Sequence, residues 1–164
     1  MNSFVELGKF FYRYRDVITL PFLLLLFILG RTESRTILPH LFIICGIVIR
    51  LWSAGYIGEK SRGRQITADY KIISAPYRIL RHPLYIGNFL LVLGTIILYN
   101  PPLWYGLLLM IIFMFEYSVI IFAEEKYLRN VQTKKVGFIY SNLKGEVSTI
   151  IVMVVIYLIY FAKM

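Results

Sequence analysis

The chain has 164 residues, of which 59% are hydrophobic, and its mean hydropathy is +0.69. Soluble domains are closer to half apolar, so this composition excludes an ordinary soluble protein and indicates an integral membrane protein. The net charge is +9. In a membrane protein, excess lysine and arginine marks cytoplasmic loops, so the charge does not indicate a nucleic-acid partner. The single cysteine, Cys45, excludes an intrachain disulfide, and we expect it to be a small buried side chain.

The apolar runs predict an all-α, polytopic helical bundle with about five transmembrane helices, because each run approaches the roughly 20 residues that cross hydrocarbon. The predicted spans cover about 16–30, 37–57, 84–99, 103–123 and 146–162. The preceding segment 3–15 mixes aromatic with basic residues, which is typical of an interfacial helix. Asn100-Pro101-Pro102 separates the third and fourth spans and predicts a tight hairpin. We expect one membrane-embedded domain over residues 1–164.

Basic residues are distributed unevenly between the predicted loops. Three precede the first span, six lie in 58–83 and five in 124–145, whereas three fall on the opposite side. Because lysine and arginine mark cytoplasmic segments, this asymmetry predicts a cytoplasmic N-terminus. It also places both polar segments on the cytoplasmic face. Since the third and fourth spans form a hairpin, the start of one and the end of the other should meet there.

The start of the third span and the end of the fourth carry the chemically interesting residues. Tyr, Arg and His side chains are concentrated within nine positions, at Tyr77, Arg78, Arg81, His82 and Tyr85. Across the hairpin, two adjacent acids, Glu124-Glu125, end the fourth span. Acidic side chains are disfavoured at a helix C-terminus. We therefore expect them to be compensated by arginine and histidine or by a cationic ligand; the alternative is a pair of solvated carboxylates.

Two ionisable residues lie inside predicted spans. Arg50 and Glu116 are each about seven residues from the cytoplasmic end, or roughly 10 Å deep at 1.5 Å per residue. Ionisable groups at that depth usually face the bundle interior and pair, so we predict an Arg50–Glu116 pair, either structural or beside a substrate pocket. His40 is expected to be structural. No histidine, cysteine or carboxylate cluster has metal-ligand spacing, so no metal site is predicted.

The motifs resemble those of the isoprenylcysteine carboxyl methyltransferase family and the related membrane phospholipid methyltransferases. The first motif is Arg81-His82-Pro83-Leu84-Tyr85-Ile86-Gly87, preceded by Pro76-Tyr77. After one membrane hairpin follows Glu124-Glu125-Lys126-Tyr127-Leu128, similar to the family pattern EExxL, and then Gly137-Phe138-Ile139-Tyr140. The resemblance covers a motif core of about 65–140, and the combination at hairpin spacing is more specific than either motif alone.

This resemblance implies an S-adenosylmethionine-dependent methyltransferase whose lipidic acceptor enters from the bilayer and whose active site faces the cytoplasm. Carried over by motif position or spacing, the implied cofactor-binding residues are Asp69, Ile72, Tyr77, Arg81, His82, Pro83, Leu84, Tyr85, Glu124 and Glu125. The candidate catalytic residues are Arg50, Glu116 and Arg81. The glutamate carboxylates suit the ribose or the ammonium group of this cofactor, and Arg81 and His82 suit its carboxylate group. The faces of the tyrosine rings suit its purine or its sulfonium.

The chain departs from the family pattern in two places that concern the acceptor. Family members that methylate a prenylcysteine carboxylate carry an arginine one turn before EExxL, where this chain has Ile120; Arg50 is a candidate replacement. The fifth span, 146–162, is additional, and we expect it either to cover the acceptor groove or to mediate a homodimer. Two alternatives remain: a membrane reductase of sterol-reductase type using NADPH, and a non-catalytic member whose basic loops bind anionic membrane lipids.

Overall fold

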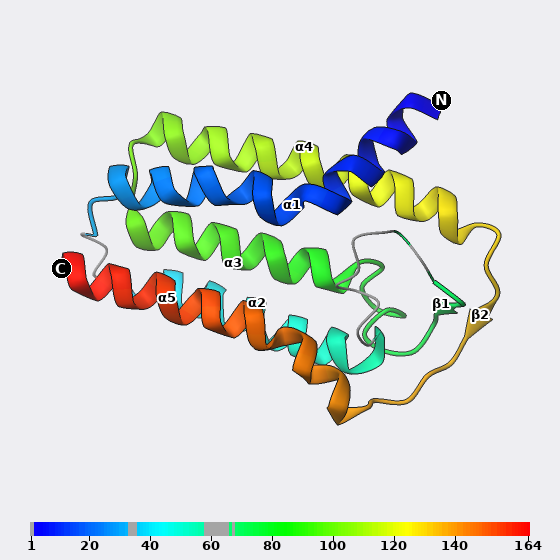
Figure 1. Cartoon of the computed structure of the whole chain (residues 1–164). Coiled ribbons are helices and arrows are strands. Elements are labelled where there is room, and N and C mark those ends of the chain that lie inside the picture. Colours follow the sequence, from blue (N-terminus) through cyan, green and yellow to red (C-terminus); the bar gives the residue numbers. More distant parts are fainter. Residues whose placement is uncertain (1, 33–35, 58–65, 67) are drawn as a thin grey trace.

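The structure is a computed structural model that describes the chain except residues 1, 33–35, 58–65 and 67 (Figure 1). The predicted all-α bundle is confirmed. Its helices are α1 (Asn2–Leu29), α2 (Leu38–Ile57), α3 (Pro83–Tyr99), α4 (Leu103–Leu128) and α5 (Val147–Lys163), with a 3₁₀ helix η2 (Tyr140–Glu146) directly before α5. Two short strands, β1 (Lys71–Ile72) and β2 (Thr133–Lys134), complete the described elements.

Three of the described helical segments are long and apolar enough to cross a membrane: Leu38–Ile57, Leu103–Leu128 and Tyr140–Lys163. The helix α3 is apolar but shorter, with 17 residues. The predicted interfacial segment 3–15 and the predicted span 16–30 form one continuous helix, α1, which passes through Pro21. Proline lacks the N–H of the helical hydrogen bond, and α1 changes direction along its length (Figure 1).

The two predicted polar segments meet at one end of the bundle. Lys71 pairs with Thr133 and Ile72 with Lys134 in a parallel two-stranded ladder, which the sequence did not predict. At the opposite end, Asn100 adopts a left-handed conformation with φ 41° and its N–H binds the Ile96 carbonyl at 2.9 Å. This closes the predicted α3–α4 hairpin. Four of the basic residues that were counted to predict a cytoplasmic N-terminus lie outside the described residues: Arg35, Lys60, Arg62 and Arg64.

Small residues allow the helices to pack closely in two pairs, α2 with α3 and α1 with α4. A Cβ atom on Gly46 of α2 would lie 2.9 Å from the Gly87 carbonyl oxygen of α3. One on Gly8 of α1 would lie 2.6 Å from the Val119 carbonyl oxygen of α4. Small side chains at such contacts are common between membrane helices because they let backbones approach each other. The cavity described below lies between the two pairs.

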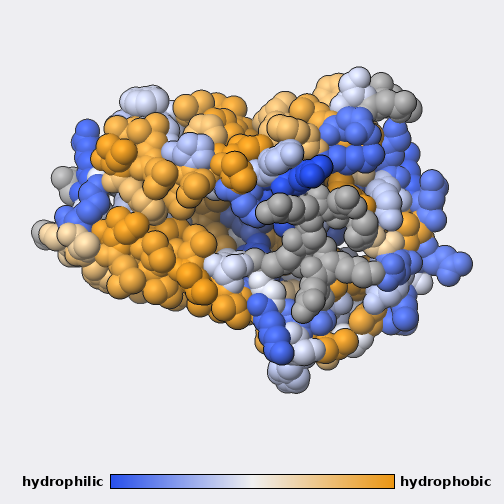
Figure 2. Space-filling view, in the orientation of Figure 1, coloured by the Kyte–Doolittle hydropathy of each residue, from blue (hydrophilic) through white to orange (hydrophobic). Residues whose placement is uncertain are grey.

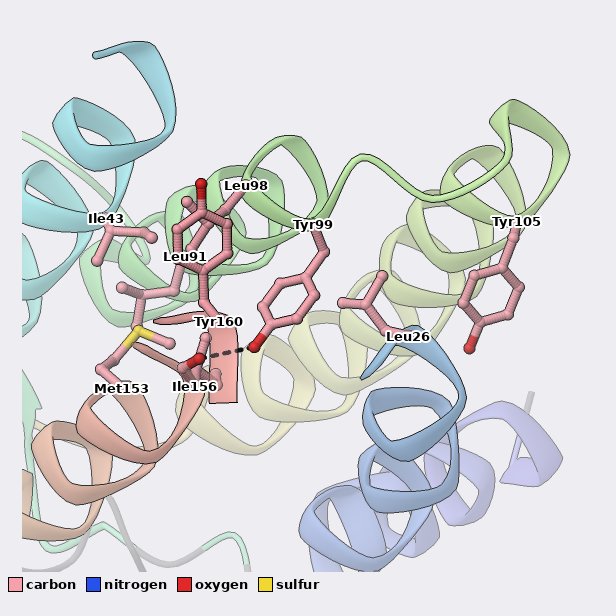
Figure 3. Close-up of a cluster of buried hydrophobic side chains, with 9 residues drawn as sticks. All are labelled: Leu26, Ile43, Leu91, Leu98, Tyr99, Tyr105, Met153, Ile156 and Tyr160. Carbon is pink, nitrogen blue, oxygen red and sulfur yellow. Dashed lines mark hydrogen bonds between the residues drawn. The ribbon is translucent and has the colours of Figure 1, made fainter. Parts of the chain in front are cut away.

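A buried cluster closes the end of the bundle where α3 turns into α4. Figure 3 shows its residues, which come from all five helices: Leu26, Ile43, Leu91, Leu98, Tyr99, Tyr105, Met153, Ile156 and Tyr160. The Tyr99 hydroxyl donates to the Ile156 carbonyl at 2.6 Å. The Lys163 ammonium donates to the carbonyls of Phe27 and Gly30, which caps the C-terminal end of α1. These bonds hold α5 against the bundle at this end.

The outer surface of the helices is predominantly apolar (Figure 2), as expected for a bundle surrounded by lipid. The prediction that Cys45 is buried is wrong, because its side chain is exposed on α2. Burial frequencies from soluble proteins do not apply where the surroundings are themselves apolar. His40, expected to be structural, contacts α5: its Nδ1 lies 2.7 Å from the Tyr157 hydroxyl.

Candidate functional site

A cavity of about 1050 Å³ lies between the α1–α4 and α2–α3 pairs, with α5 and η2 beside it. Figure 2 shows a hollow on the side of the molecule where polar side chains appear between apolar flanks. The cavity is at the upper end of the size range of small-molecule sites, so it has room for more than one ligand. One end, near the β1–β2 ladder, is lined by polar and aromatic residues; the other is apolar.

Most predicted cofactor-binding residues line the polar end of the cavity. They are Asp69, Ile72, Tyr77, Arg81, His82, Leu84, Tyr85, Glu124 and Glu125. The exception is Pro83, which is fully buried and does not line it. Pro83 is the first residue of α3, where its missing N–H costs no helical hydrogen bond. Pro83 therefore has a structural role at the start of α3.

Glu125 connects the two motifs across the hairpin. Its carboxylate accepts a hydrogen bond from the Arg81 guanidinium, and its Oε1 lies 2.9 Å from His82 Nε2. The helix α4 extends to Leu128, so both glutamates are in its last turns and beyond the predicted end of the span. The Arg81 guanidinium thus supplies the positive group that we predicted, and His82 contacts the same carboxylate. Glu125 is already occupied in fixing the start of α3.

Glu124 has a different environment from its neighbour. Its Oε2 is 3.9 Å from His82 Nδ1, beyond hydrogen-bonding distance, and the Tyr85 hydroxyl donates to its carboxylate. The His82 and Tyr85 rings are stacked with centroids 5.8 Å apart, and Tyr117 contacts Tyr85 edge-on at 5.2 Å. Glu124 is therefore a carboxylate on the cavity wall with accepting capacity left, set beside a row of aromatic rings.

Tyr77 completes the polar end from the loop before α3. Its hydroxyl donates to the Ser53 carbonyl of α2 at 3.3 Å. Burial raises the pKa of the Tyr77 hydroxyl, and the nearby carboxylates of Glu124 and Glu146 raise it further. The hydroxyl is accordingly neutral and remains a hydrogen-bond donor at physiological pH.

The predicted Arg50–Glu116 pair is wrong. Arg50 binds Glu146 through two parallel contacts, Nε to Oε2 at 2.8 Å and Nη2 to Oε1 at 3.0 Å. Its Nη1 also donates to the Asn88 side-chain oxygen, and the Asn88 amide donates to the Tyr117 hydroxyl at 2.8 Å. This chain of contacts joins η2, α2, α3 and α4 across the cavity.

Glu116 lines the same cavity but is 5% exposed, and its Oε1 has no hydrogen-bond partner among the described residues. We predicted its pairing with Arg50 because both residues lie at a similar depth in the membrane. Depth does not determine which faces of two helices contact each other. The true partner, Glu146, is 2% exposed and lies at the start of the additional fifth helix.

Glu146 reaches Arg50 because η2 is attached to the end of α2. The Gly55 carbonyl accepts from the Ile139 N–H at 2.9 Å and from the Asn142 amide at 3.1 Å. The Phe138 ring lies against Gly55, where a Cβ would approach it to 2.0 Å. The sequence analysis did not predict the roles of Asn88, Tyr117 or Glu146. Asn88, a polar residue inside a span, was a detectable signal.

The described residues contain no group of three or more histidine, cysteine or acidic side chains that could hold a metal ion. The polar end instead offers carboxylates, neutral hydroxyls and aromatic faces. These groups suit an organic ligand that carries positive charge and a ring system, because aromatic faces attract cations and carboxylates accept from ammonium or ribose hydroxyl groups.

No curated protein and no solved structure matches the chain. A family model described as phospholipid methyltransferase matches residues 34–135, more than half of the chain. The matched segment contains α2, α3, α4 and both motifs of the polar end. The chain is an integral membrane protein that belongs to the phospholipid methyltransferase family.

Proposed function

We propose that the protein transfers a methyl group from S-adenosylmethionine to a lipid-soluble acceptor at the cytoplasmic face of the membrane. The family supports methyl transfer to a lipid. The observation that carries the choice of cofactor is the Glu124 carboxylate, which has accepting capacity left and lies on the cavity wall beside Tyr85 and His82.

The residues at the polar end fit the chemical groups of this cofactor. Glu124 would accept hydrogen bonds from the ribose or the ammonium group, and Tyr77 and Tyr85 would face the purine or the sulfonium. Arg81 has guanidinium donors beyond the one used by Glu125 and would bind the carboxylate near the start of α3. When bound, the cofactor supplies an electrophilic methyl group.

The protein's own contribution to the reaction would be alignment and exclusion of water. Methyl transfer needs no covalent intermediate with the protein, so positioning the two reactants accounts for much of the rate. The apolar half of the cavity provides a dry environment beside the polar end. Of the candidate catalytic residues, Arg50 is already paired and Arg81 is held at the polar end. Glu116 lines the cavity, but its Oε1 is buried and has no partner among the described residues.

The acceptor is better described as an amine, hydroxyl or thiol than as a carboxylate. Ile120, which replaces the arginine of carboxylate-methylating relatives, is fully buried. Arg50, the candidate replacement, is neutralised by Glu146 through two contacts. Recruiting Arg50 to a carboxylate substrate would require breaking that buried pair, which is costly.

Calorimetry of the purified protein with S-adenosylmethionine and with NADPH tests the proposal. We expect binding of the first and none of the second. Binding of NADPH alone would favour the reductase, and binding of neither would favour a non-catalytic protein. Incubation with methyl-labelled cofactor and a total lipid extract, followed by identification of the labelled species, then identifies the acceptor.

A further inference from the structure

We propose that the acceptor's hydrocarbon chain enters the cavity through a slot between α1 and α5, and that these two helices hold the chain there. This inference rests on the proposed function. The slot residues line the cavity from both helices: Ile18, Thr19, Leu20, Phe22, Leu23 and Leu26 of α1, and Ser148, Thr149, Val152, Met153 and Ile156 of α5.

The slot connects the cavity to the outer surface. Leu20 is 53% exposed and Val152 is 47% exposed, yet both line the cavity. A side chain that is exposed and also lines the cavity must lie at the edge of an opening between the two. The hollow in Figure 2 lies between apolar flanks on the face where Figure 1 shows α1 above and α5 below, with α3 between them in the view. The opening therefore faces the hydrocarbon of the bilayer, which is where a lipid chain would be present.

Two other pairs of helices, α2 with α3 and α1 with α4, are closely packed. The α2–α3 and α1–α4 contacts are made through Gly46, Gly87 and Gly8, whose backbones leave no room for an added Cβ. A shallow apolar groove of about 310 Å³ lies between α3 and α4, but Tyr85, Phe113 and Tyr117 line both this groove and the cavity. These rings separate the two, and the Phe113–Tyr117 stack has centroids only 4.1 Å apart.

The slot has a defined closed end and a polar end. It ends where Lys163 binds the Phe27 and Gly30 carbonyls and where Tyr99 binds the Ile156 carbonyl. Toward the opposite end, the hydroxyl residues Thr19, Ser148 and Thr149 line it. An acceptor would place its hydrocarbon chain against Leu23, Met153 and Ile156 and its reactive head toward the polar end. A lipid with one polar end and one extended chain has this chemistry.

Both walls of the slot lie outside the residues that the family model matches. The match covers 34–135, whereas α1 ends at Leu29 and α5 begins at Val147. The predicted cofactor-binding residues, from Asp69 to Glu125, lie within it. The family-matched segment would therefore serve the step that members share, while the flanking helices hold the hydrocarbon chain of the acceptor.

The experiment uses the whole protein in phospholipid nanodiscs that contain a phospholipid with a photoactivatable diazirine in one acyl chain. Bulk lipid labels exposed residues such as Leu158, but it cannot reach Met153, which is 6% exposed. We expect label on Met153, mapped by mass spectrometry. Val152→Trp should reduce that label by about tenfold, equivalent to about 1.4 kcal/mol, because indole fills the rim.

The matched controls are Ile151→Trp and Leu24→Trp, which add the same ring to exposed positions of α5 and α1 that do not line the cavity. They should leave Met153 labelling unchanged. S-adenosylmethionine binding, measured on every variant, reports folding of the polar end; if Val152→Trp loses it, Val152→Phe replaces that variant.

Absence of label on Met153, or label unaffected by Val152→Trp, overturns the slot. So does label that moves to Phe89 and Ile121 of the α3–α4 groove. If wild-type protein shows the slot label but does not bind S-adenosylmethionine, the proposed function fails and the slot stands as a lipid site. If it binds the cofactor without slot label, only the slot fails.

Discussion

The polar end of the cavity and the slot are built from different interactions. At the polar end, residues distant in sequence are fixed by directional contacts, such as His82 with Glu125 and Tyr77 with the Ser53 carbonyl. In the slot, apolar side chains of α1 and α5 line the cavity from both sides, and Lys163 joins the two helices at one end through the Phe27 and Gly30 carbonyls.

The difference indicates two kinds of recognition. Fixed hydrogen-bonding groups discriminate strongly between ligands, because a wrong ligand leaves buried polar groups unpaired. Apolar walls discriminate weakly, by roughly 1–3 kcal/mol for a methylene. We therefore expect the protein to be strict toward its cofactor and tolerant toward the chain length of its acceptor. The following changes test that contrast and the contacts on which it depends.

The largest effect is expected where the two regions join. Glu146→Ala removes the partner of Arg50 and leaves a buried charge, which should lower the free energy of unfolding by about 3–5 kcal/mol. Thermal unfolding in detergent measures this change. Arg50→Met combined with Glu146→Leu replaces the pair with apolar side chains and should recover most of the loss. If the Glu146→Ala variant were as stable as the wild type, Arg50 and Glu146 would not form a buried ion pair.

The next effect concerns the polar end alone. Glu124→Gln should weaken S-adenosylmethionine binding by roughly tenfold to a hundredfold, because a charged acceptor contributes about 1.5–3 kcal/mol to a hydrogen bond. Thermal stability should hardly change. Calorimetry gives the affinity, and Glu125→Gln is the matched control on the adjacent residue. Because Glu125 binds Arg81 and His82, its variant should lose more stability and less affinity.

A third change tests the close packing of α2 against α3. Gly87→Ala would place a Cβ 2.6 Å from Arg50 Cγ and 3.1 Å from the Gly46 carbonyl oxygen. Overpacking of this kind costs about 1–3 kcal/mol, and thermal unfolding should show it. Gly137→Ala is the control, since its added Cβ would have no described atom within 4 Å apart from those of its chain neighbours. Equal stability of both variants would mean that α2 and α3 are not closely packed.

The sequence predicted the features that depend on local pattern. Hydropathy predicted the bundle, Asn100-Pro101-Pro102 predicted the hairpin, and the hairpin brought His82 to Glu125. It did not predict which faces of separate helices meet. Arg50 and Glu116 lie at similar predicted depths, but the attachment of η2 to Gly55 brings Glu146 to Arg50 instead. Such a contact depends on the rotation of each helix, which one sequence does not specify.

The smallest effect is expected at Glu116, and it separates two buried carboxylates that look alike in the sequence. Glu116 Oε1 has no partner among the described residues, whereas both oxygens of Glu146 bind Arg50. Replacing this carboxylate with an amide of the same size removes a buried charge, and no ion pair of Glu116 is seen among the described residues. Glu116→Gln should therefore change the unfolding free energy by less than about 1 kcal/mol, or raise it, in the same detergent assay. A loss as large as that of Glu146→Ala would show that Glu116 is paired in the folded protein.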